Sequence, residues 1–547
     1  MERRKFIKLS ATASAIALTP FEMKGIMEMQ EIKNCDFSGR RLVLINLDGG
    51  NDGLNTLIPL NQYDLYSNFR PTIKVPDTGV NKYIPLDSGL AENKQLGLHP
   101  SLNEFKNLYD NGKMRLLQSV GYPSQNKSHF ASSDIYMTGN DGNGWGNGKT
   151  SGWIGRYMEQ MYSDELGNSY PFAVQMGNVK NSLGFHGLHE HGMNMNITNQ
   201  DASGFYSVIN GLGGEAPENI PAGTDYGIEL DYIIETDKLA NIYASSISNA
   251  FNAGSNSVIY PDTNLSDQLK TVARLIKGGL QSKIYMVRLK GFDTHANQLE
   301  TGNGDILGRH DVLLKELNGA ISAFISDIEG LGIDDDVVAM TYSEFGRKVA
   351  ENGNLGTDHG EVAPMFVFGK AVEGGVSGIN PDLNEASQEN NWQVETVQYD
   401  YRAVFGTVLK EWMGGGESVI DQTFFDYTNM NSFNDSTVSE IIKTNYKIDL
   451  GCINSVKDEV DTENEGLNWF ASPNPFFDNI TLRSDDDIEK ATIKVFSQNG
   501  QLVKAIINAN YYNGMIRLDL SNLSSGIYTL NILVDGKNPE SLNVVKR

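Results

Sequence analysis

Continuous apolar runs alternate with helical patterns between about residues 40 and 450. Four apolar runs cover residues 42–47, 114–120, 284–289 and 337–342. Near-continuous apolar runs are typical of strands that are buried on both faces of a parallel sheet. Between the runs, three segments place apolar side chains three and four positions apart, at residues 265–276, 310–331 and 401–413. The alternation predicts an α/β domain over residues 40–450, with a doubly wound, mainly parallel sheet covered by helices.

After about residue 470 the pattern becomes a strict alternation of apolar and polar residues. Short alternating runs cover residues 480–482, 491–496, 515–520 and 527–534. Turn-forming Asn-Gly pairs lie among them, which is typical of antiparallel strands joined by short turns. Residues 470–547 are therefore predicted to form a small all-β sandwich. The acidic, apolar-poor stretch at residues 455–468 is predicted to be a linker.

The amino terminus has the layout of an export signal. Arg3 and Arg4 precede a weakly apolar run at residues 9–20, which is too short to cross a bilayer. The string Arg-Arg-Lys-Phe-Ile-Lys resembles a twin-arginine signal, so residues 1–30 are predicted to be a signal peptide, with the cleavage site left open. No other stretch holds 18 uncharged apolar residues, and we expect no membrane-spanning segment.

The charge of the chain narrows the choice of partners. The 547 residues include 44 Lys and Arg against 69 Asp and Glu, a formal net charge of -25. Nucleic-acid binding depends on a cationic surface, so this balance argues against a nucleic-acid partner. An anionic substrate would need local positive charge, which a bound metal ion can supply. Only two cysteines occur, which excludes a zinc site built from cysteines.

Polar motifs follow the four apolar runs of the central domain. In chain order they are Asp48-Gly-Gly-Asn-Asp52, Lys127-Ser128-His129, Asp293-Thr-His295 and Ser343-Glu344-Phe-Gly-Arg347. A fifth motif, Asp358-His359 between two glycines, precedes the apolar run at residues 365–368. Ligands of open α/β sheets bind at the carboxyl ends of the strands, so we expect these motifs to meet in one site. Aspartate and histidine there would supply oxygen and nitrogen ligands to a metal ion.

These motifs, in this order over about 400 residues, resemble the bacterial family called domain of unknown function 1501. That family resembles the alkaline phosphatase and sulfatase superfamily. The resemblance implies an alkaline-phosphatase-like sheet, one or two divalent metal ions, an Asp-His-Gly metal loop and a nucleophile at a helix amino terminus. We therefore expect metal ligands among Asp52, Asp293, His295, Asp358 and His359. We expect catalytic roles for Ser128 as the nucleophile and for His129, Glu344 and Arg347.

Several of these residues keep alternative interpretations. Ser128 also suits a helix N-cap, and His129 can be a ligand, an acid or a packing residue. Glu344 and Arg347 can bind a metal or an oxyanion, or pair with each other. Whether Asp48 or Asp52 is the ligand is left open, since aspartates in Gly-rich turns often bind backbone N–H groups. A second histidine group is predicted to be a surface loop outside the site, and its members are His186, His189 and His191.

The last segment resembles the C-terminal sorting domain of type IX secretion cargo in Bacteroidetes. The resemblance rests on Ser472-Pro-Asn-Pro-Phe476, on residues 520–528 and on the basic tail at residues 544–547. It implies a partnership with the type IX secretion machinery, and export through the periplasm to the cell surface or the medium. The alternative is an ordinary carbohydrate-binding or immunoglobulin-like sandwich.

Together these features predict a secreted, metal-dependent hydrolase that acts on phosphate or sulfate esters. The ion can be zinc, calcium, magnesium or manganese, because the motifs do not separate them. An anionic ester or a glycan is the expected substrate. The alternative is a non-catalytic surface protein that keeps the fold and binds a glycan or a partner, or serves as a scaffold.

Overall fold

The computed structural model describes residues 39–142, 151–162, 169–176, 183–187, 194–197, 242–301, 305–425, 438, 440–448, 469–472, 474, 476–484, 490–497, 502–510, 515–534 and 540–546. The predicted signal peptide, the predicted linker, both cysteines, His189 and His191 lie outside these residues. No helix within the described ranges is long and apolar enough to cross a bilayer.

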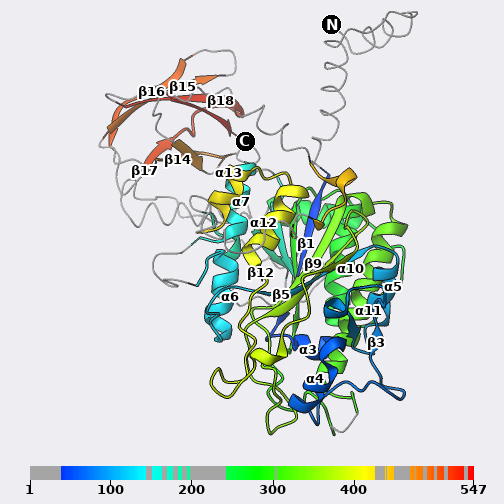
Figure 1. Ribbon diagram of the computed structural model, residues 1–547. Helices are drawn as coiled ribbons and strands as arrows, with labels where there is room; N and C mark the ends of the chain where they lie inside the picture. Colours follow the sequence, from blue (N-terminus) through cyan, green and yellow to red (C-terminus); the bar gives the residue numbers. More distant parts are fainter. Residues whose placement is uncertain are drawn as a thin grey trace, which may run out of the picture.

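Nine strands of the described residues form the central sheet, with β1 in the middle (Figure 1). The order is β11-β5-β10-β9-β1-β8-β6-β7, and β12 pairs with β5. The strands are β1 (Arg41–Asp48), β5 (Met114–Gly121), β6 (Ala173–Met176), β7 (Asn194–Ile197), β8 (Ile284–Lys290), β9 (Val337–Tyr342), β10 (Ala363–Phe368), β11 (Gly375–Ser377) and β12 (Tyr399–Asp400). All run parallel except β10, which is antiparallel to β5 and β9.

The direction of β10 matters for the site. Because β10 is antiparallel to its neighbours, its amino end lies at the edge where the parallel strands end. Residues that precede β10 therefore meet residues that follow β1, β8 and β9. The Asp358-His359 motif reaches the common edge in this way, from the opposite chain direction to the other motifs.

Helices cover both faces of the sheet, as the alternating side chains of β1 require. Val43, Ile45 and Leu47 pack with the helices of one face, and Leu42 and Leu44 pack with those of the other. The first face carries α5 (Asn103–Asp110), α10 (Asn264–Lys277) and α11 (Arg309–Gly330). The second carries α6 (His129–Thr138), α7 (Trp153–Met161), α12 (Tyr401–Glu411) and α13 (Glu417–Thr423). The predicted doubly wound, mainly parallel class is confirmed.

Smaller elements that the sequence pattern did not predict extend the domain. A second sheet of order β2-β4-β3 is built from β2 (Leu57–Pro59), β3 (Ile84–Pro85) and β4 (Leu96–Leu98). The short helices are α3 (Gly53–Thr56), α4 (Tyr63–Phe69), η2 (Leu60–Gln62), η3 (Glu92–Lys94), η5 (Leu183–Phe185), η6 (Asp334–Asp336), η7 (Leu383–Glu385) and η10 (Thr444–Tyr446).

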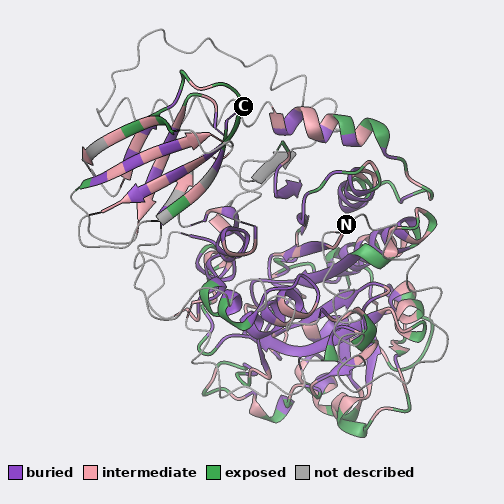
Figure 2. Ribbon diagram, turned by 90° about the horizontal axis from the view of Figure 1, so that it is seen from above, coloured by how far each residue is buried: buried purple, intermediate pink, exposed green. Residues whose placement is uncertain are grey.

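The carboxy-terminal segment forms two antiparallel sheets around a core of its own, as predicted. One sheet has the order β13-β14-β17 and the other β16-β15-β18-β19. The strands are β13 (Trp469–Ser472), β14 (Asn479–Ser484), β15 (Lys490–Ser497), β16 (Leu502–Asn510), β17 (Met515–Asp519), β18 (Gly526–Leu533) and β19 (Glu540–Lys546). Buried and partly exposed residues alternate along these strands (Figure 2). The core includes Ile480, Leu482, Ile493, Val495 and Leu530.

His310 on α11 makes the stability of the central domain depend on pH. Its ring is 1% exposed, and Nε2 donates to Asn51 Oδ1 at 3.1 Å. Burial lowers the pKa of His310 to about 4, so the folded protein keeps the ring neutral where an unfolded chain would protonate it. The free energy of unfolding should fall by roughly 3 kcal/mol as pH drops from 6.5 to 4, at about 1.4 kcal/mol per pKa unit.

Urea unfolding at several pH values tests this expectation. His310→Gln keeps a donor for Asn51 but cannot titrate. The variant should therefore lose less stability between pH 6.5 and 4 than the wild type does. Equal losses in the two proteins would show that His310 is not responsible.

Candidate metal site at the carboxyl edge of the sheet

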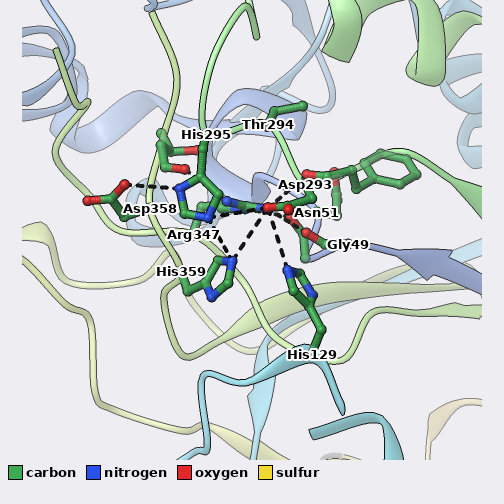
Figure 3. Close-up of polar contacts among 12 residues, drawn as sticks. Gly49, Asn51, His129, Asp293, Thr294, His295, Arg347, Asp358 and His359 are labelled. Atoms are coloured by element: carbon green, nitrogen blue, oxygen red, sulfur yellow. Dashed lines mark hydrogen bonds and ion pairs between the residues drawn. The ribbon is translucent and has the colours of Figure 1, made fainter. Parts of the chain in front are cut away.

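Four loops and one helix end meet at the carboxyl edge of the sheet (Figure 3). The loops follow β1, β8 and β9 and precede β10, and the helix end is the start of α6. Their backbones touch directly. Gly49 has φ of +121°, and a Cβ there would lie 2.3 Å from the backbone nitrogen of Asp293. A Cβ on Gly356 would lie 2.4 Å from the carbonyl oxygen of Thr294. Glycine at these positions lets the loops approach closely enough to share one site.

Three histidine rings converge on one carboxylate oxygen, Asp293 Oδ1. The Nε2 atoms of His129, His295 and His359 lie 3.5, 3.3 and 3.4 Å from it. The Nε2 atoms of His295 and His359 are 2.9 Å apart. His129, Asp293 and His359 each offer a ligand atom within 4.8 Å of the others. We call His129, Asp293, His295 and His359 the histidine cluster.

The opposite nitrogen of each ring faces a hydrogen-bond acceptor. His129 Nδ1 lies 2.7 Å from Glu344 Oε1, and His295 Nδ1 lies 3.1 Å from Asp358 Oδ1. His359 Nδ1 lies 2.7 Å from the carbonyl oxygen of Lys127. Each Nδ1 therefore carries the hydrogen, and each Nε2 turns its lone pair toward the cluster. Ligand histidines in metal sites are oriented in this way by an acceptor on the far nitrogen.

This arrangement fits a metal ion. Two lone pairs facing each other at 2.9 Å repel unless a proton or a cation lies between them. His129 Nε2 is buried and has no hydrogen-bond partner. The imidazole nitrogens of His129 and His359 with the Asp293 oxygen, and His295 Nε2 beside them, are donors that suit zinc and other transition metals better than calcium or magnesium.

The charges of the cluster are set by its surroundings. Partial burial acts to raise the pKa of Asp293, but the hydrogen bond and charge of Arg347 outweigh it and lower that pKa to about 2. The hydrogen bond to Glu344 raises the pKa of His129. Burial lowers the pKa of His359. Asp293 is therefore a carboxylate at neutral pH, ready to bind a cation.

Arg347 and Glu344 lie under the cluster and hold its parts together. The Arg347 side chain is fully buried and donates to the carbonyl oxygens of Gly49, Gly50, Phe292 and Thr357, and to Asp293 Oδ1 at 2.9 Å. Glu344 is 2% exposed and accepts the backbone N–H of Gly49 at 2.9 Å as well as His129. Both residues were predicted to be catalytic; their described bonds connect the loops of the cluster, and a catalytic role stays a prediction.

Asp48 and Asp52 each pair with an arginine outside the cluster. Asp52 is fully buried, its Oδ2 pairs with Arg70 at 2.6 Å, and no described contact joins it to the histidines. The structure therefore does not bring this predicted ligand to the others, because its charge is already neutralised inside the domain. Asp48 pairs with Arg288 at 2.5 Å.

Gln298 connects Asp52 to the site, a role that the sequence pattern did not reveal. Its Nε2 donates to Asp52 Oδ2 at 2.5 Å. Its Oε1 accepts from Thr294 Oγ1 at 3.1 Å and from Thr357 Oγ1 at 3.0 Å. Thr294 lies between two cluster residues, and Thr357 immediately precedes Asp358 and His359. One amide thus ties the two ligand loops to a buried ion pair.

Ser128 is the N-cap of α6, with no side-chain capping bond and an exposed position. Ser128 lies between Lys127, which contacts His359, and His129, which is part of the cluster. No described contact joins the Ser128 hydroxyl to the cluster. His186 lies in the loop after η5, and its carbonyl oxygen accepts the N–H of Gly152. His189 and His191 lie outside the described residues, so the position of this histidine group stays a prediction.

A cavity of about 470 Å³ opens beside the cluster. His129, Asp293 and Glu344 are among the residues that line it. The rest follows the carboxyl ends of β1, β6, β8 and β9 and one face of α6. The size is within the usual range for small-molecule sites.

Comparisons with known proteins define the class of the chain. Residues 270–421 match the family model described as protein of unknown function (DUF1501), and residues 472–545 match the model described as secretion system C-terminal sorting domain. One segment of the chain is thus similar to DUF1501 proteins and the last segment to secretion sorting domains, in agreement with the two resemblances. The sorting domain indicates export across the outer membrane to the surface or the medium, and contact with that secretion machinery. The type of signal peptide stays a prediction.

A search of curated proteins finds no match. Similar solved structures include a protein in the alkaline phosphatase superfamily from Vibrio parahaemolyticus, at 8% identity and a TM-score of 0.30, covering 92% of this chain and 79% of that one. A lipoteichoic acid synthase from Listeria monocytogenes matches at 9% identity and a TM-score of 0.33, and the match covers 87% of this chain and 92% of that one. A DUF3244 protein with an immunoglobulin-like β-sandwich from Bacteroides vulgatus matches at 14% identity and a TM-score of 0.13. This match covers 15% of this chain and 99% of that one. These likenesses concern the fold only.

Proposed function

We propose that the protein is a secreted, metal-dependent hydrolase of phosphate or sulfate esters. The observation that carries the proposal is the convergence of three Nε2 atoms on Asp293 Oδ1, with every Nδ1 held by an acceptor. The nitrogen-rich donor set favours zinc as the ion. Asp52 is not part of this set, and Asp358 acts on the ion through His295.

His129, Asp293, His295 and His359 would hold the ion, which supplies positive charge to an anionic ester and polarises its oxygens. Glu344 keeps His129 in the tautomer that presents Nε2, and Arg347 keeps Asp293 ionised. Lys348 lies 3.3 Å from Asp358 and adds positive charge near the cluster. An acidic protein can in this way attract an anionic substrate to one place.

Ser128 is the proposed nucleophile. It stands at the amino end of a ten-residue helix, where the free N–H groups and the helix dipole favour negative charge. Its hydroxyl makes no capping bond, so capping does not occupy it. Attack by this oxygen on the ester would displace the alcohol and leave a covalent intermediate that water hydrolyses.

The test is metal analysis of the purified full chain, followed by hydrolysis assays with phosphate and sulfate esters. We expect bound zinc, and turnover that a chelator removes and added zinc restores. Ser128→Ala should keep the metal and lose turnover. Metal without turnover of any ester would favour the non-catalytic binding or scaffold alternative. A chain that binds no divalent ion would overturn the proposal.

The metal affinity of the two loops that contain Asp293 and His359 should depend on Gln298. Gln298→Leu keeps all four ligands but removes the acceptor of Thr294 and Thr357, so the loops lose their common anchor. Loss of such a supporting bond typically lowers metal affinity by about 10–100-fold. Competition with a chromogenic chelator measures the affinity. Gln422→Leu, at an exposed position of α13, is the matched control and should bind zinc as the wild type does. Equal affinity in both variants would contradict the anchoring role.

A further inference from the structure

The cavity beside the cluster has an apolar wall that the proposed chemistry does not use. Met137, Met176, Met286 and Tyr342 line it, and each is at most 5% exposed. Phe130 also lines it and is 75% exposed, an unusual position for a phenylalanine. Methionine side chains adapt to the shape of a bound ring, and an exposed aromatic ring can stack on one.

Two polar groups of the inner cavity contact the sulfur of Met286, whereas the buried Asn46 Oδ1 has no hydrogen-bond partner among the described residues. Gln175 Nε2 lies 3.6 Å from Met286 Sδ, and Tyr342 Oη lies 3.7 Å from the same sulfur. Arg288, the one cation among the described lining residues, pairs with Asp48 at 2.5 Å. Burial raises the pKa of Tyr342, so the phenol stays neutral.

The charged residues of the cavity are mostly acidic. Asp48, Asp134, Asp293 and Glu344 line it against the single Arg288. A negative group placed there would meet a neutralised arginine and several carboxylates. A second negative charge on a ligand would thus lose its hydration without gaining a partner.

We propose that this cavity receives the alcohol part of the ester, and that it selects an uncharged, ring-bearing alcohol such as a phenol or a naphthol over one that carries a second negative charge. The inference rests on the proposed hydrolase function for its biological meaning. The anionic group of the ester would lie at the cluster end, where His129 and Asp293 line the cavity, and the ring along the methionine wall.

Binding of free alcohols tests the cavity without relying on turnover. Calorimetry on the full chain would compare 1-naphthol with 1-hydroxy-2-naphthoate, which adds one carboxylate. We expect 1-naphthol to bind about tenfold more tightly, because the carboxylate has no free cation to meet. Equal affinity, tighter binding of the naphthoate, or no binding of 1-naphthol would overturn the inference.

Two variants test which residues make the selection. Phe130→Ala should weaken 1-naphthol binding by about 3–10-fold through the lost ring contact, whereas Ile259→Ala, at an even more exposed site (97%), should not. Asp48→Asn removes the carboxylate that pairs with Arg288, and should reduce the affinity difference between 1-naphthol and the naphthoate by at least about threefold. An unchanged affinity difference between the two ligands in Asp48→Asn would contradict the role of Asp48. An equal effect of Phe130→Ala and Ile259→Ala on 1-naphthol binding would contradict the role of Phe130.

Turnover then separates the two proposals. If the zinc-loaded chain binds 1-naphthol selectively but hydrolyses neither 1-naphthyl phosphate nor 1-naphthyl sulfate, the hydrolase proposal fails and the cavity assignment stands. If it hydrolyses esters of charged and uncharged alcohols equally well, the hydrolase proposal stands and the cavity assignment fails.

Discussion

Asp293→Asn is expected to lower the zinc affinity by more than about 100-fold and to abolish any ester hydrolysis. The variant replaces the one oxygen that all three histidines face by a neutral amide oxygen. Loss of a mere supporting bond costs about 10–100-fold in affinity, and loss of a charged ligand should cost more. Chelator competition and metal content after dialysis measure the effect.

The fold should survive this change. An asparagine oxygen can still accept from Arg347, and the Asp293 side chain is 47% exposed. The thermal midpoint should therefore stay close to that of the wild type. Asp305→Asn, at a carboxylate whose bonds among the described residues are to Thr301 and Leu307 of its own loop, is the matched control and should keep full zinc affinity. Wild-type zinc affinity in Asp293→Asn would mean that the metal binds elsewhere in the protein.

Arg347→Met is expected to reduce the free energy of unfolding by about 3–5 kcal/mol, the largest loss we expect from one side chain at the site. The fully buried guanidinium holds four carbonyl oxygens from three loops, together with Asp293. Methionine fills much of the same volume but leaves these acceptors without donors. Urea unfolding of the two proteins at pH 7 measures the difference.

Lys410→Met provides the comparison for this variant. Lys410 pairs with Glu417 at the surface, and exposed ion pairs contribute at most about 1 kcal/mol. A loss below 1 kcal/mol in Arg347→Met would mean that water replaces the arginine, and that the loops do not depend on it.

The sequence pattern predicted the strands of the sheet better than their arrangement. The runs at β1, β5, β8 and β9 were readable because strands buried on both faces contain almost no polar residue. The reversed direction of β10 could not be predicted from the sequence, since strand direction depends on packing with neighbours rather than on the residues of the strand itself. The sheet of β2, β3 and β4 was missed because its strands are only two or three residues long.

Only the part of the site that lies in short sequence motifs was predicted. Asp293, His295 and His359 were expected as ligands, because aspartate and histidine follow or precede strands in short motifs. His129 was expected nearby, although in a catalytic role. The burial of Asp52 could not be predicted, because its partner Arg70 lies 18 residues away and belongs to no recognisable motif. Gln298 carries no signal in one sequence, since an amide has no charge and no characteristic spacing.

The separation of the cluster residues along the chain has a consequence for synthesis and folding. Asp293 and His359 are 66 residues apart, whereas His129 contacts Glu344 across 215 residues. Closing the longer loop costs about 1 kcal/mol more conformational entropy. The ribosome also releases α6 long before the segment around His359, whose contact with Lys127 spans 232 residues. An ion bound by all four residues is therefore retained only by chains in which synthesis has passed β9 and the central sheet has closed.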